Sequence, residues 1–122
     1  MWRIEQTRFG APEGNCIAAS YASLLETPLG EIPSFRPPGQ RGKERRWLRT
    51  LGYDLVVVPV PERGALPSVP DDVYHLMSGR SPRDRRFGHR VVGRGGHLAW
   101  DPHPSHDGLA ELDAFLFVVP LF

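Results

Sequence analysis

Cysteine is almost absent from this chain: Cys16 is the single one in 122 residues. One cysteine excludes an intramolecular disulfide and a zinc site built from four cysteines. A lone thiol is typical of proteins from reducing compartments. The first residues, Met-Trp-Arg-Ile-Glu-Gln, also lack the apolar segment of a secretory signal. Together these absences predict a cytoplasmic protein.

Lysine and long apolar runs are scarce as well. Lys43 is the one lysine, so arginine supplies nearly all of the 15 basic residues, which 14 acidic residues almost balance. A net charge of +1 argues against a binder of nucleic-acid phosphates, which usually carries a basic excess on one face. No apolar run approaches the roughly 20 residues of a membrane span. We therefore expect neither a nucleic acid nor a membrane as the partner.

Length and composition indicate one folded domain over residues 1–122. A chain of this length suits one domain, since domains most often have about 100–150 residues. Hydrophobic residues make up 40% of the chain and charged residues 24%, close to globular averages. With 13 glycines and 13 prolines, we expect short elements joined by many loops.

The apolar pattern predicts helices first and strands later. Ile17, Tyr21, Leu24 and Leu25 form one helical stripe, and Asn15 before them is a suitable N-cap. The predicted elements are a short strand at 2–6, helices at 16–26 and 40–51, and strands at 53–60, 73–78, 89–93, 97–101 and 114–121, with proline-rich loops at 31–39 and 61–71. This order indicates an α+β fold in which the first helix packs on a mostly antiparallel sheet of four to six strands.

The position of Cys16 favours a reactive thiol. It stands at the start of the predicted helix, where the peptide dipoles sum to roughly half a positive charge. The free N–H groups of the first turn point the same way, so both effects favour the thiolate. The same groups could stabilise an oxyanion on an attacked carbonyl. The alternative is a buried core cysteine, because free cysteine is among the most buried residue types.

A predicted hairpin around Gly95-Gly96 carries a histidine and a carboxylate. With a two-residue turn, His89 pairs with Pro102; with a three-residue loop, it pairs with Asp101, and both loop lengths are common. We favour the three-residue loop, since it sets imidazole and carboxylate opposite each other. Such a carboxylate fixes the tautomer and leaves the other ring nitrogen for a nucleophile.

These features resemble the papain-like cysteine peptidases. The resemblance rests on the thiol at a helix start in Gly14-Asn15-Cys16, on His-x-Val-Val from His89, and on the later Asp101-Pro102. It is nearest to the compact branch that cleaves leader peptides in bacteriocin exporters. It extends to short phage and bacterial proteins with Ser-Pro-Arg and Asp-Pro-His-Pro-Ser segments, and it covers residues 6–109.

The resemblance implies a cysteine hydrolase that cleaves a peptide, isopeptide or other amide through an acyl-enzyme. Cys16 would be the nucleophile, His89 the general base and then acid, and Asp101 the orienting carboxylate. The usual position of the oxyanion-hole glutamine holds Gly10, so Gln6 and Asn15 are the candidate donors. The partner would be a protein or peptide substrate in the cytoplasm of a bacterium, or of a host if a phage encodes the chain. The alternative is a catalytically silent binding module, such as a phage accessory protein that targets a host partner.

A metal site is less well supported. The candidate ligands are His97, His103 and His106 with Asp101 and Asp107. Only His103 and His106 are close in sequence, and their segment is a proline-rich loop with no cysteine nearby. We therefore expect no metal and no cofactor. The sequence does not predict an oligomeric state.

Overall fold

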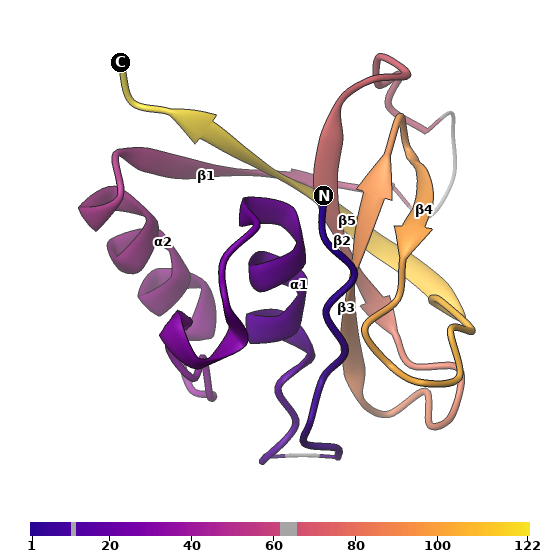
Figure 1. The fold of residues 1–122 in the computed structure, drawn as a ribbon. Helices are drawn as coiled ribbons and strands as arrows, with labels where there is room; N and C mark the ends of the chain where they lie inside the picture. Colours follow the sequence, from indigo (N-terminus) through magenta and orange to yellow (C-terminus); the bar gives the residue numbers. More distant parts are fainter. Residues whose placement is uncertain (11, 62–65) are drawn as a thin grey trace.

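The computed structural model describes residues 1–10, 12–61 and 66–122. Two α-helices pack on one face of a five-stranded antiparallel sheet with the strand order β1-β5-β2-β3-β4 (Figure 1). The elements are α1 (Cys16–Leu25), a 3₁₀ turn η1 (Leu29–Glu31), α2 (Gln40–Thr50), β1 (Tyr53–Pro59), β2 (Tyr74–Arg80), β3 (Gly88–Arg94), β4 (His97–Trp100) and β5 (Glu111–Pro120). The predicted α+β class is confirmed.

The last strand, β5, occupies the middle of the sheet. It pairs with β1 on one side, where Leu55 lies opposite Val118, and with β2 on the other, where Leu76 lies opposite Leu116. Helix α1 packs against β2 and β3, and α2 packs against β1. The start of α1 therefore comes to lie over β3, which carries His89.

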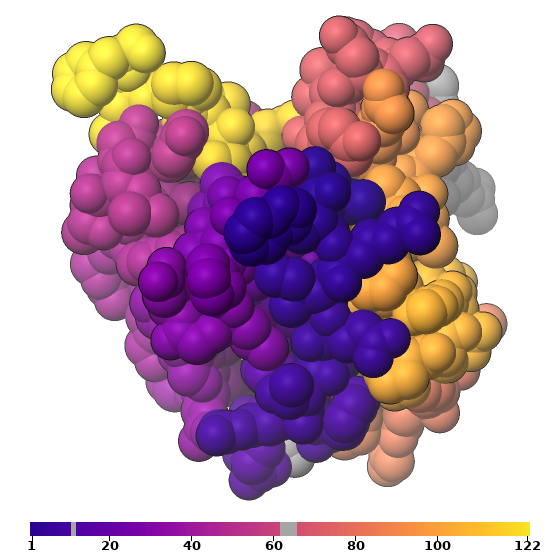
Figure 2. Space-filling model, viewed as in Figure 1, coloured from indigo at the N-terminus to yellow at the C-terminus, as the bar shows by residue number. Residues whose placement is uncertain are grey.

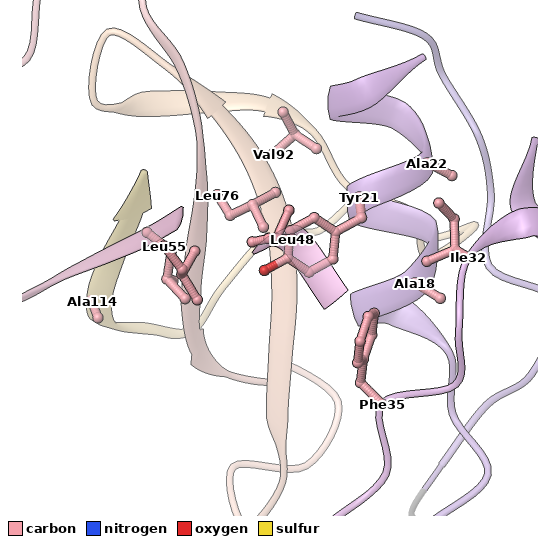
Figure 3. Close-up of a cluster of buried hydrophobic side chains, with 11 residues drawn as sticks. Ala18, Tyr21, Ala22, Ile32, Phe35, Leu48, Leu55, Leu76, Val92 and Ala114 are labelled. Carbon is pink, nitrogen blue, oxygen red and sulfur yellow. The ribbon is translucent and has the colours of Figure 1, made fainter. Parts of the chain in front are cut away.

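The main core fills the space between the helices and the sheet (Figure 3). Tyr21 of α1 is fully buried, and its ring packs against Phe35 at 5.7 Å and Trp47 at 5.4 Å between centroids. Where α1 meets the sheet, the small side chain of Ser20 donates its hydroxyl to Arg90 O of β3 at 3.1 Å, while Ala18 and Ala22 lie on the side of the helix that faces Ile32 (Figure 3). All four residues of the predicted stripe contact the core, but only Tyr21 among them is fully buried. The buried part of the helix is residues 18–23.

The predicted strand at residues 2–6 is wrong. This segment is extended, yet its hydrogen bonds go to a helix and to a loop: Trp2 N–H donates to Ser23 O, and Gln6 N–H donates to Pro102 O. The indole of Trp100 donates to Ile4 O at 2.9 Å. The segment lies across the front of the molecule, between α1 and the β3–β4 hairpin (Figure 2). The segment therefore connects α1 to β4 and to the loop that follows β4, without joining the sheet.

The other predicted elements differ only at their ends. Part of the predicted loop at 61–71 lies outside the described residues, as does residue 11 of the loop before α1. Of the helices described, none combines the length and the apolar character needed to cross a bilayer.

Candidate active site

Cys16 is the first residue of α1 and is half-buried. It borders a cavity of about 430 Å³ together with His89, Gln6 and His103. A second cavity of about 290 Å³ also reaches Cys16 and His89. The thiol and the imidazole therefore lie where the two cavities meet. The N–H groups of the first helical turn have no carbonyl partners within the helix and are available near the thiol.

His89 and Asp101 are in direct contact. The His89 Nε2 atom lies 2.7 Å from Asp101 Oδ1, and only 6% and 2% of the two residues is exposed. The Asp101 carboxylate also accepts the backbone N–H groups of His103 at 2.9 Å and Gly108 at 2.8 Å. Because Nε2 faces the carboxylate, Nδ1 is the ring nitrogen left for the thiol.

The hairpin register that suggested this contact is wrong. Arg94 pairs with His97 across a two-residue turn, in which Gly95 and Gly96 have φ values of 61° and 85°. Two glycines adopt such positive φ values without strain, which favours the tight turn over the three-residue loop. The register then shifts between Val92 and Gly93, and β4 ends at Trp100.

Asp101 consequently follows the end of β4 and faces His89 from the start of the next loop. Its carboxylate accepts hydrogen bonds from the backbone N–H groups of His103 and Gly108 and thereby holds that loop in place. The Asp-Pro-His-Pro-Ser segment is therefore an ordered wall of the site. His103 borders the larger cavity, as expected of such a wall.

The charges of this group favour a thiolate beside an imidazolium. Burial raises the pKa of Cys16, but hydrogen bonding and charge from His89, then the amide and charge of Arg90, outweigh it and lower the pKa of the thiol. Burial lowers the pKa of His89, but the hydrogen bonds of Asp101 and Cys16 and their charges raise it to about 9. Burial also opposes ionisation of Asp101, whereas the His89 contact and the two amides lower its pKa overall.

Gln6 returns to the site through the extended N-terminal segment. It is 7% exposed and borders the larger cavity with Cys16 and His89. Its Nε2 donates to Arg8 O at 2.9 Å, and in the described part of the chain its buried Oε1 has no hydrogen-bond partner. A primary amide has two N–H groups, so one remains for a ligand in the cavity.

Asn15 occupies the N-cap position, but its side chain does not serve as a cap. Its Oδ1 accepts the N–H groups of Thr7 at 3.0 Å and Arg8 at 2.9 Å, and its Nδ2 donates to Thr7 Oγ1. Its backbone, at φ −117° and ψ 31°, departs from the extended conformation of capping residues. Asn15 therefore fastens the loop that returns Gln6 to the cleft, and one of its own two N–H groups is taken by Thr7.

Two further buried residues, Arg90 and its partner Glu44, escaped sequence analysis. Arg90 follows His89 directly and borders the smaller cavity with Cys16. Its guanidinium forms a buried ion pair with Glu44 of α2 at 2.7 Å. The available signal was the spacing of Glu44, which falls on the same helical stripe as Trp47, Leu48 and Leu51. A carboxylate on an apolar stripe predicts a buried partner.

Two of the candidate metal ligands, His103 and His106, lie in different surroundings. His103 Nδ1 lies 2.9 Å from Ser105 Oγ, whereas the His106 ring packs on Trp100 with centroids 4.8 Å apart. Within residues 1–10, 12–61 and 66–122, no three His, Cys, Asp or Glu side chains are grouped as a metal ion would need.

No protein-family model, curated protein or solved structure matches the chain. The papain-like resemblance thus rests on the sequence motifs alone, while the α+β architecture rests on the structure.

Proposed function

We propose that the protein is a cysteine hydrolase that cleaves an amide bond through Cys16, His89 and Asp101. The observation that carries the proposal is the 2.7 Å contact between His89 Nε2 and Asp101 Oδ1, which leaves Nδ1 for the thiol. The lowered pKa of Cys16 and the pKa of about 9 for His89 support a thiolate–imidazolium pair. This pairing is the form in which a cysteine acts as a nucleophile.

In the first half of the reaction, Cys16 Sγ attacks the carbonyl carbon and forms a C–S bond. The π electrons of the carbonyl move onto its oxygen, which the Cys16 backbone N–H and the free N–H of Gln6 would stabilise. The His89 imidazolium gives its proton to the leaving nitrogen, and the C–N bond breaks. The amine departs and an acyl-enzyme remains.

In the second half, neutral His89 takes a proton from water, and the hydroxide attacks the acyl carbon. The tetrahedral intermediate collapses, the C–S bond breaks, and a carboxylic acid leaves. Sulfur regains the electron pair as thiolate beside the imidazolium. Asp101 holds the ring in the tautomer that both halves require.

The substrate is a peptide, isopeptide or other amide presented by a protein or peptide partner. A free thiol at the site has to stay reduced, which is consistent with action in the cytoplasm.

Acyl transfer from p-nitrophenyl acetate tests the proposal. The wild-type protein should release a burst of p-nitrophenol and gain one acetyl group on Cys16, detected by intact mass and peptide mapping, before hydrolysis restores the thiol. His89→Ala removes the imidazolium that favours the thiolate and should slow acylation by about 10²–10⁴-fold, the usual contribution of a positioned acid–base side chain. The Cys16→Ser variant, which lacks the thiol, is the negative control. A folded wild-type protein that forms no acyl adduct would contradict the proposal and favour the binding-module alternative.

A further inference from the structure

The larger cavity beside Cys16 is large enough to hold part of a substrate. Its volume of about 430 Å³ falls within the range of about 300–1,000 Å³ that is typical of small-ligand sites. Because Cys16 and His89 form part of its wall, any group that fills it lies next to the bond under attack.

Apolar rings dominate this wall. Phe9 is 49% exposed and Phe87 is 44% exposed, while Phe35 also lines the cavity and is almost buried. Ile17, Pro12 and Pro37 extend the apolar surface. Large aromatic rings left half in water at a cavity are a surface that an apolar ligand covers favourably.

Two charged side chains of the same wall, Asp84 and Arg83, are each held by a hydrogen bond to a neighbouring side chain. Asp84 binds the Arg86 guanidinium at 2.7 Å, and Arg83 donates to Ser105 Oγ at 2.9 Å. The smaller cavity differs in character, since Arg41, Arg90 and Asp113 contribute to its lining. The two cavities meet at Cys16 and His89, and the aromatic side chains of the cleft line the larger one.

We propose that the larger cavity is a specificity site for a bulky apolar side chain, aromatic or branched aliphatic, adjacent to the scissile amide. The inference rests on the proposed function and names its substrate class: amides flanked by a large apolar residue. Phe9 and Phe87 are the specificity-determining residues.

The room for such a group depends on the loop before α1. Gly14 N–H donates to Gly10 O, and both glycines border the cavity. A Cβ on Gly14 would lie 2.7 Å from Gly10 O, closer than real contacts allow. The tight loop thereby keeps Phe9 at the cavity wall while Gln6 stays beside the thiol.

Matched electrophiles test the site without knowledge of the natural substrate. N-benzyl chloroacetamide and N-carboxymethyl chloroacetamide alkylate a thiolate by the same step: sulfur bonds to the methylene carbon and chloride leaves with the electron pair. Their rates at Cys16, each divided by the rate with glutathione, should favour the benzyl probe by roughly tenfold, as burial of an aromatic group predicts. Phe9→Ala and Phe87→Ala should each reduce that preference severalfold. Phe122→Ala, at a fully exposed ring, should leave it unchanged.

Equal corrected rates for the two probes would overturn the inference, as would a preference that survives both cavity substitutions in folded protein. Faster reaction of the carboxymethyl probe would also overturn it, and would indicate recognition of a carboxylate instead. Iodoacetamide, which has neither group, monitors activation of the thiol separately. If the pH dependence of Cys16 alkylation by iodoacetamide matches that of a free thiol, the hydrolase proposal is contradicted. The ratio of the corrected rates of the two chloroacetamides still decides whether the cavity selects apolar groups.

Discussion

The guanidinium of Arg90 lies 2.7 Å from Glu44 Oε1, and both side chains are almost wholly buried. The same carboxylate oxygen accepts the hydroxyl of Tyr21 at 2.6 Å. Arg90 follows His89 in β3, and both its backbone amide and its positive charge favour the thiolate form of Cys16. The pair therefore connects α2 and the core of α1 to the electrostatics of the candidate nucleophile.

Removal of one member of this pair should destabilise the fold strongly. Arg90→Met leaves the Glu44 carboxylate buried without its cation, a change that costs about 3–5 kcal/mol. The double variant Glu44→Gln/Arg90→Met removes both charges and should recover much of that loss. Urea unfolding of the four proteins gives the coupling free energy. Additive losses would mean that the two side chains do not stabilise each other.

The two single substitutions should also shift the pKa of Cys16 in opposite directions. Arg90→Met removes a cation that favours the thiolate, so the pKa should rise. Glu44→Gln keeps the hydrogen-bonding shape but leaves the Arg90 charge uncompensated, so the pKa should fall. The alkylation rate against pH measures both values, and Arg46→Gln on the exposed face of α2 is the control for loss of charge. If both substitutions shifted the pKa of Cys16 in the same direction, the charge of Arg90 would not control that pKa, and Arg90 would serve only in packing.

The His89 ring should titrate well above an ordinary histidine. Its pKa of about 9 exceeds the unfolded value of about 6.5. Its stabilising contribution is therefore fully present below pH about 6.5 and is lost as the pH rises through about 9. Nitrogen chemical shifts of the ring should show a midpoint near the higher value. Asp101→Asn removes the charge and should lower that midpoint; an unchanged midpoint would show that Asp101 does not set the state of His89.

A second buried histidine, His75, should make the fold sensitive to acid. It is fully buried, its Nε2 accepts Gly96 N–H at 2.9 Å, and its Nδ1 lies 3.1 Å from Leu76 O. Burial lowers its pKa, although the bond to Leu76 partly opposes this. The unfolded chain then binds a proton more readily, so stability should fall as the pH drops below about 6.5.

Unfolding free energies at about pH 7.5 and about pH 5 should therefore differ less in His75→Gln than in the wild type, because glutamine does not titrate. The matched control is His106→Gln, since that side chain is 49% exposed. An undiminished difference in His75→Gln would show that acid acts elsewhere.

The fold class could be predicted because its signals are local. The apolar stripe through Tyr21 and the valine-rich run of β1 each specify an element without reference to the rest of the chain. Residues 2–6 were mistaken for a strand because an extended backbone has the same local pattern whichever groups it binds. Their partners, Ser23 and Pro102, come from distant parts of the chain.

The sequence was sufficient to predict which residues form the candidate site, but not how the backbone brings them together. Sequence reasoning brought His89 and Asp101 together through a ladder register, whereas the contact forms after β4 has ended. The Gly95-Gly96 pair favours the two-residue turn, but no local pattern marks the register shift between Val92 and Gly93. Arg90 and Glu44 lie 46 positions apart, and no short motif links them.

The pH dependence of Cys16 alkylation by iodoacetamide, in the wild type and in His89→Ala, tests the central claim most directly. In the wild type the reaction midpoint should lie below the free-thiol pKa of about 8.5, since His89 and Arg90 together outweigh burial. In His89→Ala the midpoint should rise to that value or above it, because burial is then opposed by Arg90 alone. A wild-type midpoint at or above the free-thiol value, unchanged by His89→Ala, would contradict an activated thiol and with it the hydrolase.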